Sequence, residues 1–264
     1  MILPGALLYP MAVPPVGLKA ISFSVCVRKP TALAVSLGEG EDGPRYMKLV
    51  WCDGDEWDDV VLPVSELMPD NDGPADPDGK LSPEHLSALV FIDLGGAFRS
   101  GIENGPFVFE PLGEQTIWLD DLKLLSEDPS PQKPEVAENV TVLNHYDAPL
   151  TGALIMGGED RTVDYDDGDP EGDCLKLTYA LSGNTIIALA QPVARGALKD
   201  AASVRLKVKA SAQTQLVIAL GETPDAPNLE ETSYAYVEQI EAAAGWKELD
   251  IPVSRFQLDV GKHD

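Results

Sequence analysis

The chain contains one stretch of sequence twice. Residues 31–39 read TALAVSLGE and residues 214–222 read TQLVIALGE, with the threonine, both leucines, the glycine and the glutamate identical at an offset of 183 residues (214 minus 31). Apolar residues alternate with small or polar ones in both copies, a pattern that predicts a β-strand. Because an ordered series of matches marks an internal repeat, we expect the chain to hold two copies of one unit.

The match continues downstream of this stretch. Trp57 is followed by DDVVLPVSEL and Trp246 by KELDIPVSRF, now at an offset of 189 residues (246 minus 57), so the second copy carries six extra residues in between (189 minus 183). The period is far too long for a solenoid, and the unit should therefore be a domain. A tryptophan that recurs at the same place in both copies favours a packing role for Trp57 and Trp246.

Short alternating segments extend outward from the repeat. Turn-forming glycine, proline and aspartate separate them, and no long amphipathic helix is evident. This spacing is typical of an all-β antiparallel sandwich. Strands are expected at 4–10, 20–27, 33–37, 46–52, 60–64, 89–94, 115–125, 140–145, 175–181, 185–190, 204–208, 214–222, 233–240 and 246–253, with loops at 69–85, 95–114 and through the acidic run DYDDGDPEGD at 164–173.

The domain organisation follows from a proline-rich, charged segment, SEDPSPQKPEVAE, at 126–138. It predicts a semi-rigid linker at 128–138 between one unit at 1–127 and another at 139–264. Each unit carries a stretch that the other lacks, at 140–181 and at 71–124. Either both units are partial, or strands from 140–181 pack back onto 1–124; we favour partial units, because half a sandwich leaves unpaired edges.

Charge limits the kind of partner. The chain has 44 acidic and 19 basic residues, a formal net charge of −25. This balance argues against nucleic acid and against anionic membranes as partners. It permits a cation, a neutral glycan or simple solubility. No run approaches the ~18 apolar residues of a membrane-spanning helix.

The cysteines and the N-terminal stretch give little sign of function. Cys26, Cys52 and Cys174 show no metal-ligand spacing, and being odd in number they cannot all pair with one another. Cys26 and Cys52 could form a disulfide, but buried free thiols are favoured. The start of the chain is apolar, yet it has no basic segment and carries several prolines, so we expect a strand and a loop there rather than a signal peptide.

Four segments together resemble a known group of domains. They are CLKLTYAL at 174–181, the strands ending in LGE, the twice-occurring pattern W-x4-[LI]-P-V-S-x-[LF], and TIWLDDLKL at 116–124. The chain resembles the galactose-binding-like jelly-roll domains of bacterial carbohydrate-binding modules and of complex I intermediate-associated proteins. The resemblance implies two tandem jelly-roll units, a polysaccharide or oligosaccharide partner, and a secreted or cell-surface bacterial protein with neighbouring domains in a longer chain.

A glycan-binding face needs aromatic rings that stack on the apolar faces of sugars and polar groups that bind hydroxyls. The aromatic candidates are Tyr46 and Trp51 in the first unit and Tyr234 and Tyr236 in the second. The two second-unit tyrosines share one face of a strand with Glu238, since they lie at period two. Equally, these tyrosines could line the core. The polar candidates are Arg45, Glu39 and Glu222.

The resemblance also implies a structural calcium ion near Asp120 and Asp121, between the first and last strands. Asp121 is the better candidate of the two, because adjacent strand residues face opposite sides of a sheet. Calcium requires about six to eight oxygen ligands. The acidic runs at 70–78 and 164–173 are rich in oxygen but lack EF-hand spacing, and a solvated acidic surface is the simpler interpretation.

Catalysis has no anchor in the sequence. His85, His145 and His263 lack zinc-binding spacing, and neither a G-x-S-x-G nor a P-loop motif occurs. We therefore predict a non-catalytic pair of carbohydrate-binding modules. The alternatives are a structural, protein-interaction or assembly-factor-like module, and a fragment of a multidomain glycoside hydrolase.

Overall fold

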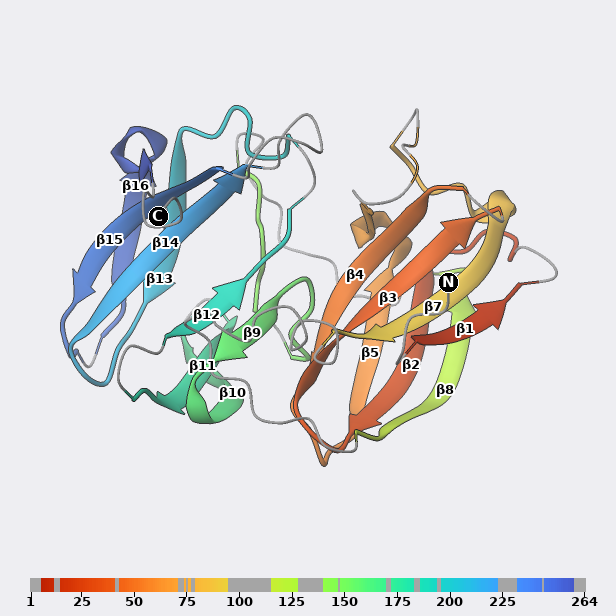
Figure 1. The fold of residues 1–264 in the computed structure, drawn as a ribbon, viewed down its shortest axis with the longest axis horizontal. Helices are drawn as coiled ribbons and strands as arrows, with labels where there is room; N and C mark the ends of the chain where they lie inside the picture. Colours follow the sequence, from red (N-terminus) through yellow and green to blue (C-terminus); the bar gives the residue numbers. More distant parts are fainter. Residues whose placement is uncertain are drawn as a thin grey trace. The chain divides into compact units, whose positions relative to one another are not determined.

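A computed structural model describes residues 6–11, 15–40, 43–70, 74, 76, 79–94, 115–127, 140–146, 148–169, 172–182, 186–193, 196–222, 232–243 and 245–258. The elements in these ranges are β-strands and three short 3-10 helices, which confirms the predicted all-β class (Figure 1). The elements are β1 Ala6–Pro10, β2 Ala20–Val27, β3 Thr31–Glu39, β4 Arg45–Cys52, β5 Asp58–Pro63, η1 Val64–Glu66, β6 Met68–Pro69, η2 Pro83–His85, β7 Leu86–Asp93, β8 Ile117–Leu125, β9 Leu154–Gly157, β10 Glu159–Asp169, β11 Gly172–Ala180, β12 Ile187–Ala190, β13 Ser203–Val208, β14 Thr214–Glu222, β15 Thr232–Ile240, β16 Lys247–Pro252, η3 Val253–Arg255 and β17 Gln257–Leu258.

The chain divides into two compact units, residues 1–193 and 194–264. The sequence led us to expect the division at 128–138, a segment that lies outside the described residues. Residues 140–193 thus belong with the first unit rather than with the second copy of the repeat. The physical reason is an apolar cluster, described below, that joins them to the first copy.

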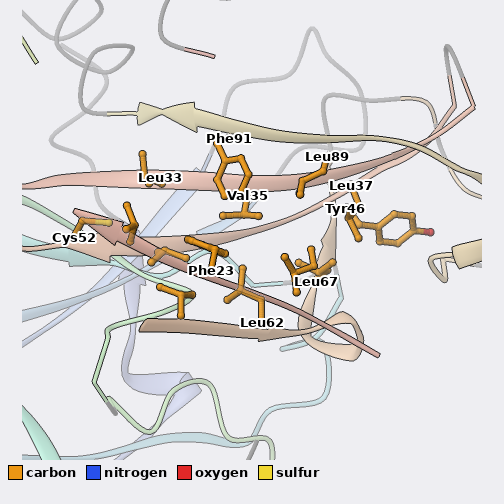
Figure 2. Packing of buried hydrophobic residues seen from close by; sticks show 14 of the residues in the cluster. Phe23, Leu33, Val35, Leu37, Tyr46, Cys52, Leu62, Leu67, Leu89 and Phe91 are labelled. Carbon is orange, nitrogen blue, oxygen red and sulfur yellow. The ribbon is translucent and has the colours of Figure 1, made fainter. Parts of the chain in front are cut away.

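The first unit contains two antiparallel sheets with an apolar core between them. One sheet has the order β1-β7-β3-β4-β6 and the other the order β5-β2-β8. Alternate residues of β2 and β5 point into the core, as period-two burial requires, and β3, β4, β7 and β8 contribute to it from their inner faces. Phe23 of β2 meets Phe91 of β7 edge to face, with ring centroids 5.1 Å apart. In Figure 2, Tyr46 lies at one end of this core and Cys52 at the other.

The opposite face of the five-stranded sheet is covered by residues 148–190. Trp51 and Leu49 of β4 pack against Leu150 and Ile155, and β9, β10, β11 and β12 contribute partly buried apolar residues to the same cluster. The backbone joins in, since the Trp51 amide donates to the Leu150 carbonyl over 2.9 Å. Strands from 140–181 therefore do pack back onto the first copy, the arrangement that sequence analysis weighed and did not favour.

The acidic run at 164–173, expected as a loop, lies largely in strands. β10 and β11 pair antiparallel across it, with Asp164 opposite Lys176. Val163 and Tyr165 pack against the cluster on the covered sheet, while the Asp164 carboxylate lies 3.7 Å from the Lys176 ammonium. Asp164, which alternates with Val163 and Tyr165, thus lies on the solvent side of the strand. By contrast, the strand expected at 140–145 is irregular chain.

The second copy repeats the first in strand register as well as in sequence. The β2–β5 pair Ala20↔Pro63 has its counterpart in the β13–β16 pair Ser203↔Pro252, at the two offsets that the sequence gives. A 3-10 helix follows the second strand in both copies, at Val64–Glu66 and Val253–Arg255. The internal repeat is therefore a repeat of structure.

The hairpin that follows shows where the second copy is longer. Leu37 pairs with Tyr46 in β3–β4, and Leu220 pairs with Tyr234 in β14–β15. Tyr234 is thus the counterpart of Tyr46, at an offset of 188 (234 minus 46), and five of the six extra residues lie in this hairpin (188 minus 183). Among the described residues, the unit 194–264 has no counterpart of β7 or β8.

Candidate functional site

The structure places three of the four predicted glycan-binding rings in cores. Tyr46 is 1% exposed, Trp51 3% and Tyr236 7%, while Tyr234 is half-buried. Tyr46 and Tyr236 lie on the inner faces of their strands, so the alternative interpretation, that the tyrosines line the core, fits the structure better. Trp51 lies on the other face of β4, where residues 148–190 cover it.

The predicted polar partners do not gather around these rings. Arg45 lies at the start of β4, where its Nε is 3.6 Å from Asp70. Glu39 is buried and accepts a hydrogen bond from the backbone amide of Ser82. The Glu222 side chain lies outside the described residues. Arg45 and Glu39 therefore do not build an open binding face.

Trp51 belongs to a closed polar cluster. Its indole nitrogen donates to Asp53 over 2.5 Å, and the Arg161 guanidinium carbon lies 5.1 Å from the centroid of its ring. Burial raises the pKa of Asp53 above its usual range, although the Trp51 hydrogen bond and the Arg161 charge oppose this. The arrangement is a cation–π contact that packs two parts of the unit together.

Two other tryptophans are exposed. Trp57 is 54% exposed, which corrects the packing role expected from its recurrence, and Trp118 is 47% exposed. In the β5-β2-β8 sheet, Trp118 pairs with Cys26 of the central strand. On the other side of β2 the last pair is Val25 with Asp58, and Trp57 directly precedes Asp58 in the chain. Continuing this register by one residue would place Trp57 opposite Cys26, in the same row as Trp118.

The next row of the same face is polar. Ser24 pairs with Asp59 of β5 on one side and with Asp120 of β8 on the other. The Ser24 hydroxyl donates to the Asp59 carboxylate over 2.6 Å. Val25, Ile117 and Leu119 face the core, so alternation puts these polar side chains on the outside of the sheet. We name this surface the tryptophan face: Trp57, Trp118, Cys26, Ser24, Asp59 and Asp120.

The tryptophan face has the composition of a carbohydrate platform. Strands two apart in a sheet are separated by about 10 Å, the length scale of a disaccharide. Indole rings offer apolar surfaces to sugar C–H groups, and the carboxylates behind them accept hydrogen bonds from hydroxyls. This face was not predicted from the sequence, because recurrence favours packing for Trp57 and because Trp118 stands out only as part of the TIWLDDLKL segment. Alternation along 117–120 was the signal that could have found it.

The described residues around Asp120 and Asp121 provide too few oxygen ligands for the predicted calcium ion. A β-bulge interrupts β8, where Ser22 pairs with Lys123 and Ser24 with Asp120, and Asp121 in the bulge has a φ of 51°. Its carboxylate lies 3.4 Å from the Lys123 ammonium. In the part of the chain that the structure describes, no group of three or more acidic, histidine or cysteine side chains could hold a metal. Two carboxylates do not fit a calcium shell by themselves, and calcium stays a prediction.

A shallow cavity beside β4 is a weaker candidate. It has a volume of about 190 Å³ and is lined by Met47, Lys48, Leu49, Met68, Pro69, Asp70, Pro192 and Val193. Ligand pockets are usually larger, on the order of 300–1,000 Å³. The lining offers no aromatic ring, so it lacks the stacking surface that the tryptophan face provides.

The thiols are those expected for buried free cysteines. Cys26 and Cys52 are buried, Cys174 is half-buried, and none of the three forms a disulfide. Burial raises the pKa of Cys52, with the nearby carboxylate of Asp58 adding to the shift. A thiol held in its protonated form is a poor nucleophile. Cys52 therefore serves packing at the end of the core.

The raised pKa of Asp58, the residue after Trp57, predicts that the stability of the fold depends on pH. Burial, followed by the charges of Asp53, Glu56 and Asp59, raises its pKa from 3.8 to about 6. The folded state then binds a proton more tightly than the unfolded state does. Asp58 therefore makes the fold less stable as pH rises from about 4 to 6, and the cost is complete above pH 6.

Asp58→Asn should remove this cost, because asparagine does not ionise. Two pKa units correspond to about 3 kcal/mol, which we reduce to about 1 kcal/mol because the side chain is half open to water. Urea unfolding at pH 7.5 and pH 4 measures the effect. We expect the variant to gain stability over the parent at pH 7.5 and not at pH 4. Asp55→Asn, an exposed change in the same loop, is the control, and a gain equal at both pH values would refute the assignment.

The comparisons with known proteins add no relative. No family model matches the chain, and neither a curated protein nor a solved structure matches it. No helix within the described ranges is long and apolar enough to cross a membrane. The tryptophan face is therefore the main indication of function in this chain.

Proposed function

We propose that this protein is a non-catalytic carbohydrate-binding protein and that the tryptophan face of the β5-β2-β8 sheet is its binding surface. The observation that carries the proposal is the pair of half-exposed tryptophans, Trp118 on β8 and Trp57 directly before β5, which the register of the sheet would place in one row. Among the described residues of the unit 194–264 no strand corresponds to β8, so that part of the second copy offers no counterpart of Trp118.

The chemistry favours a neutral glycan. Asp59 and Asp120 lie in the row behind the tryptophans, and the whole chain carries a formal net charge of −25. Carboxylates accept hydrogen bonds from sugar hydroxyls but repel uronic acids and sulfates. An extended neutral polysaccharide would lie across the three strands, with sugars about one disaccharide length apart on Trp57 and Trp118.

The outer face of the second copy carries different side chains from the tryptophan face. In the row next to the equivalent of the Ser24 row, Arg205 of β13 is paired with Asp250 of β16, and the Arg205 Nε lies 3.0 Å from the Asp250 carboxylate. Mixed charges at these positions are typical of a solvated face. We therefore assign one binding surface to the chain, on a repeat that we propose is a pair of related jelly-roll units, the second incomplete. A secreted or surface location follows from this proposal.

The experiment that tests the function is affinity gel electrophoresis of the whole chain through neutral and acidic polysaccharides. We expect retardation in at least one neutral β-linked polysaccharide and none in acidic ones. Calcium and a chelator are added in separate gels to test the calcium prediction. If no glycan retards the folded chain, the protein-interaction alternative takes precedence, since exposed tryptophans are also frequent hot spots of protein interfaces.

A further inference from the structure

The outer face of the β14-β15-β17 sheet carries only uncharged residues. Leu216, Ile218 and Tyr236 point inward, since they belong to the apolar core of this unit or pack against it. Alternation therefore turns the residues between them outward. In a chain in which 24% of residues are charged, the outward positions hold Gln215, Val217, Ala219 and Gly221 on β14, Ser233, Ala235, Val237 and Gln239 on β15, and Gln257 on β17.

Two exposed valines lie at the centre of this face. Val217 pairs with Val237 across the two strands, and their side chains are 54% and 49% exposed. The next outward pair along the strands is Ala219 with Ala235, which extends the apolar surface without adding bulk. Single exposed apolar residues are ordinary on a protein surface, whereas neighbouring ones mark an interaction site.

The first copy shows that the fold uses this same face for packing. At the offsets of the repeat, Val217 corresponds to Ala34 (217 minus 183) and Val237 to Leu49 (237 minus 188), and these two residues also pair with each other. Ala34 is 0% exposed and Leu49 is 3% exposed, because residues 148–190 cover them. Within the described part of the second unit, no layer covers the corresponding face.

Charge favours a second copy of the chain as the occupant of this face. With a formal net charge of −25, two copies repel one another over most of their surfaces, so close contact is least opposed where neither copy carries charge. The face is also self-complementary. A two-fold axis through the Val217–Val237 pair would place the valines of one copy on the valines and alanines of the other, with the sheets stacked about 10 Å apart.

We infer that the chain forms a two-fold symmetric dimer in which the outer β14-β15 faces of two copies stack on each other. The strands have nine residues each, so the face, with β17 included, spans about 30 Å by 15 Å. This contact covers about 450 Å² per copy, less than the ~800 Å² of a standard stable interface. The dimer should therefore be weak, with a dissociation constant on the order of 100 µM.

The inference goes beyond glycan binding and does not depend on it. It has one consequence for experiments at low concentration. At a few µM the chain is then a monomer, in which Val217 is an ordinary exposed side chain. The dimer would bring two tryptophan faces into one particle, which raises avidity for a long polysaccharide if that face binds glycan.

Sedimentation velocity of the whole chain, from about 5 µM to 500 µM, tests the inference. We expect a reversible monomer–dimer equilibrium that strengthens several-fold when NaCl is raised from 20 mM to 300 mM, because salt screens the repulsion between two acidic copies. An interface built from ion pairs would respond in the opposite direction, and a dimer that dissociates as salt rises would therefore refute stacking through the uncharged face.

Variants at the two valines locate the interface. Val217→Glu and Val237→Glu should each weaken dimerisation at least tenfold, because the two-fold axis brings two like charges together in an apolar contact. Val217→Ile should preserve the dimer. Val253→Glu makes the same change at an exposed valine of η3 and should leave dimerisation unchanged. Thermal melts at low concentration confirm that each variant folds.

A mixing experiment tests the symmetry. Val217→Lys, like Val217→Glu, should fail to dimerise alone, whereas an equimolar mixture of the two variants should dimerise, since the axis then pairs opposite charges. The inference would be overturned by a chain that stays monomeric at 500 µM (the upper limit of about 500 µM set above). It would equally be overturned by a dimer that tolerates Val217→Glu and Val237→Glu as well as it tolerates Val253→Glu, or by a mixture that stays monomeric.

Discussion

Leu33→Ala is expected to cost about 3–4 kcal/mol of stability, whereas Leu216→Ala, at the equivalent position of the second copy, should cost about 1–2 kcal/mol. Leu33 is 1% exposed between two sheets, while Leu216 is half-buried. The two leucines occupy equivalent positions in the repeat, so both variants remove the same side-chain atoms. The difference between the two costs measures the cover that β7 and β8 supply to the first copy alone.

Urea unfolding followed by pulsed hydrogen exchange and mass spectrometry reports each copy separately, because peptides from β3 and β14 differ in sequence. Val217→Ala, on the exposed face of β14, is the control and should change stability by less than about 0.5 kcal/mol. Equal costs at Leu33 and Leu216 would contradict the view that the second copy is incomplete.

Trp118→Ala is expected to weaken glycan binding about thirtyfold, the effect of removing a hot-spot residue worth about 2 kcal/mol. Trp57→Ala should weaken it by a similar factor, and the double variant should abolish retardation in affinity gels. The physical reason is that each substitution removes an indole ring on which a sugar would stack. Because both side chains are about half exposed, their removal should leave the fold intact.

The matched control is Tyr179→Ala. Tyr179 is an exposed aromatic residue on β11, away from the tryptophan face. It should change neither glycan binding nor the melting temperature appreciably. If Tyr179→Ala weakened binding as much as Trp118→Ala, aromatic exposure in general, and not the row on the β5-β2-β8 sheet, would explain retention.

The repeat and most strands could be predicted from the sequence, because period-two alternation and turn residues are local signals. β2 begins and ends where alternation predicted, and once the β2–β5 pairing is known, the offsets between the copies account for the register of β13 with β16. A strand with one apolar and one polar face is stable where its apolar face packs on a core and its polar face meets water. Register follows once the same residues recur in both strands of a pair.

Exposure could not be predicted in the same way, because it depends on which segment covers which face. Trp51 alternates outward from the first core, yet residues 148–190 cover it. Trp57 recurs in both copies but lies outside the core. The acidic strand β10 was not predicted, because its aspartates suggest a loop. Its pairing with β11, which is a long-range interaction, makes it a strand. These are long-range effects that no window of sequence contains.

The most direct test of the central claim is the indole N–H region of a ¹⁵N spectrum, recorded while the retained glycan is titrated into the whole chain. The chain has four tryptophans, and single Trp→Phe variants assign their signals. We predict that the signals of Trp57 and Trp118 shift together with one dissociation constant, while those of Trp51 and Trp246 stay in place. Shifts confined to Trp51 or Trp246, or no shift at a glycan concentration that retards the chain, would contradict binding at the tryptophan face.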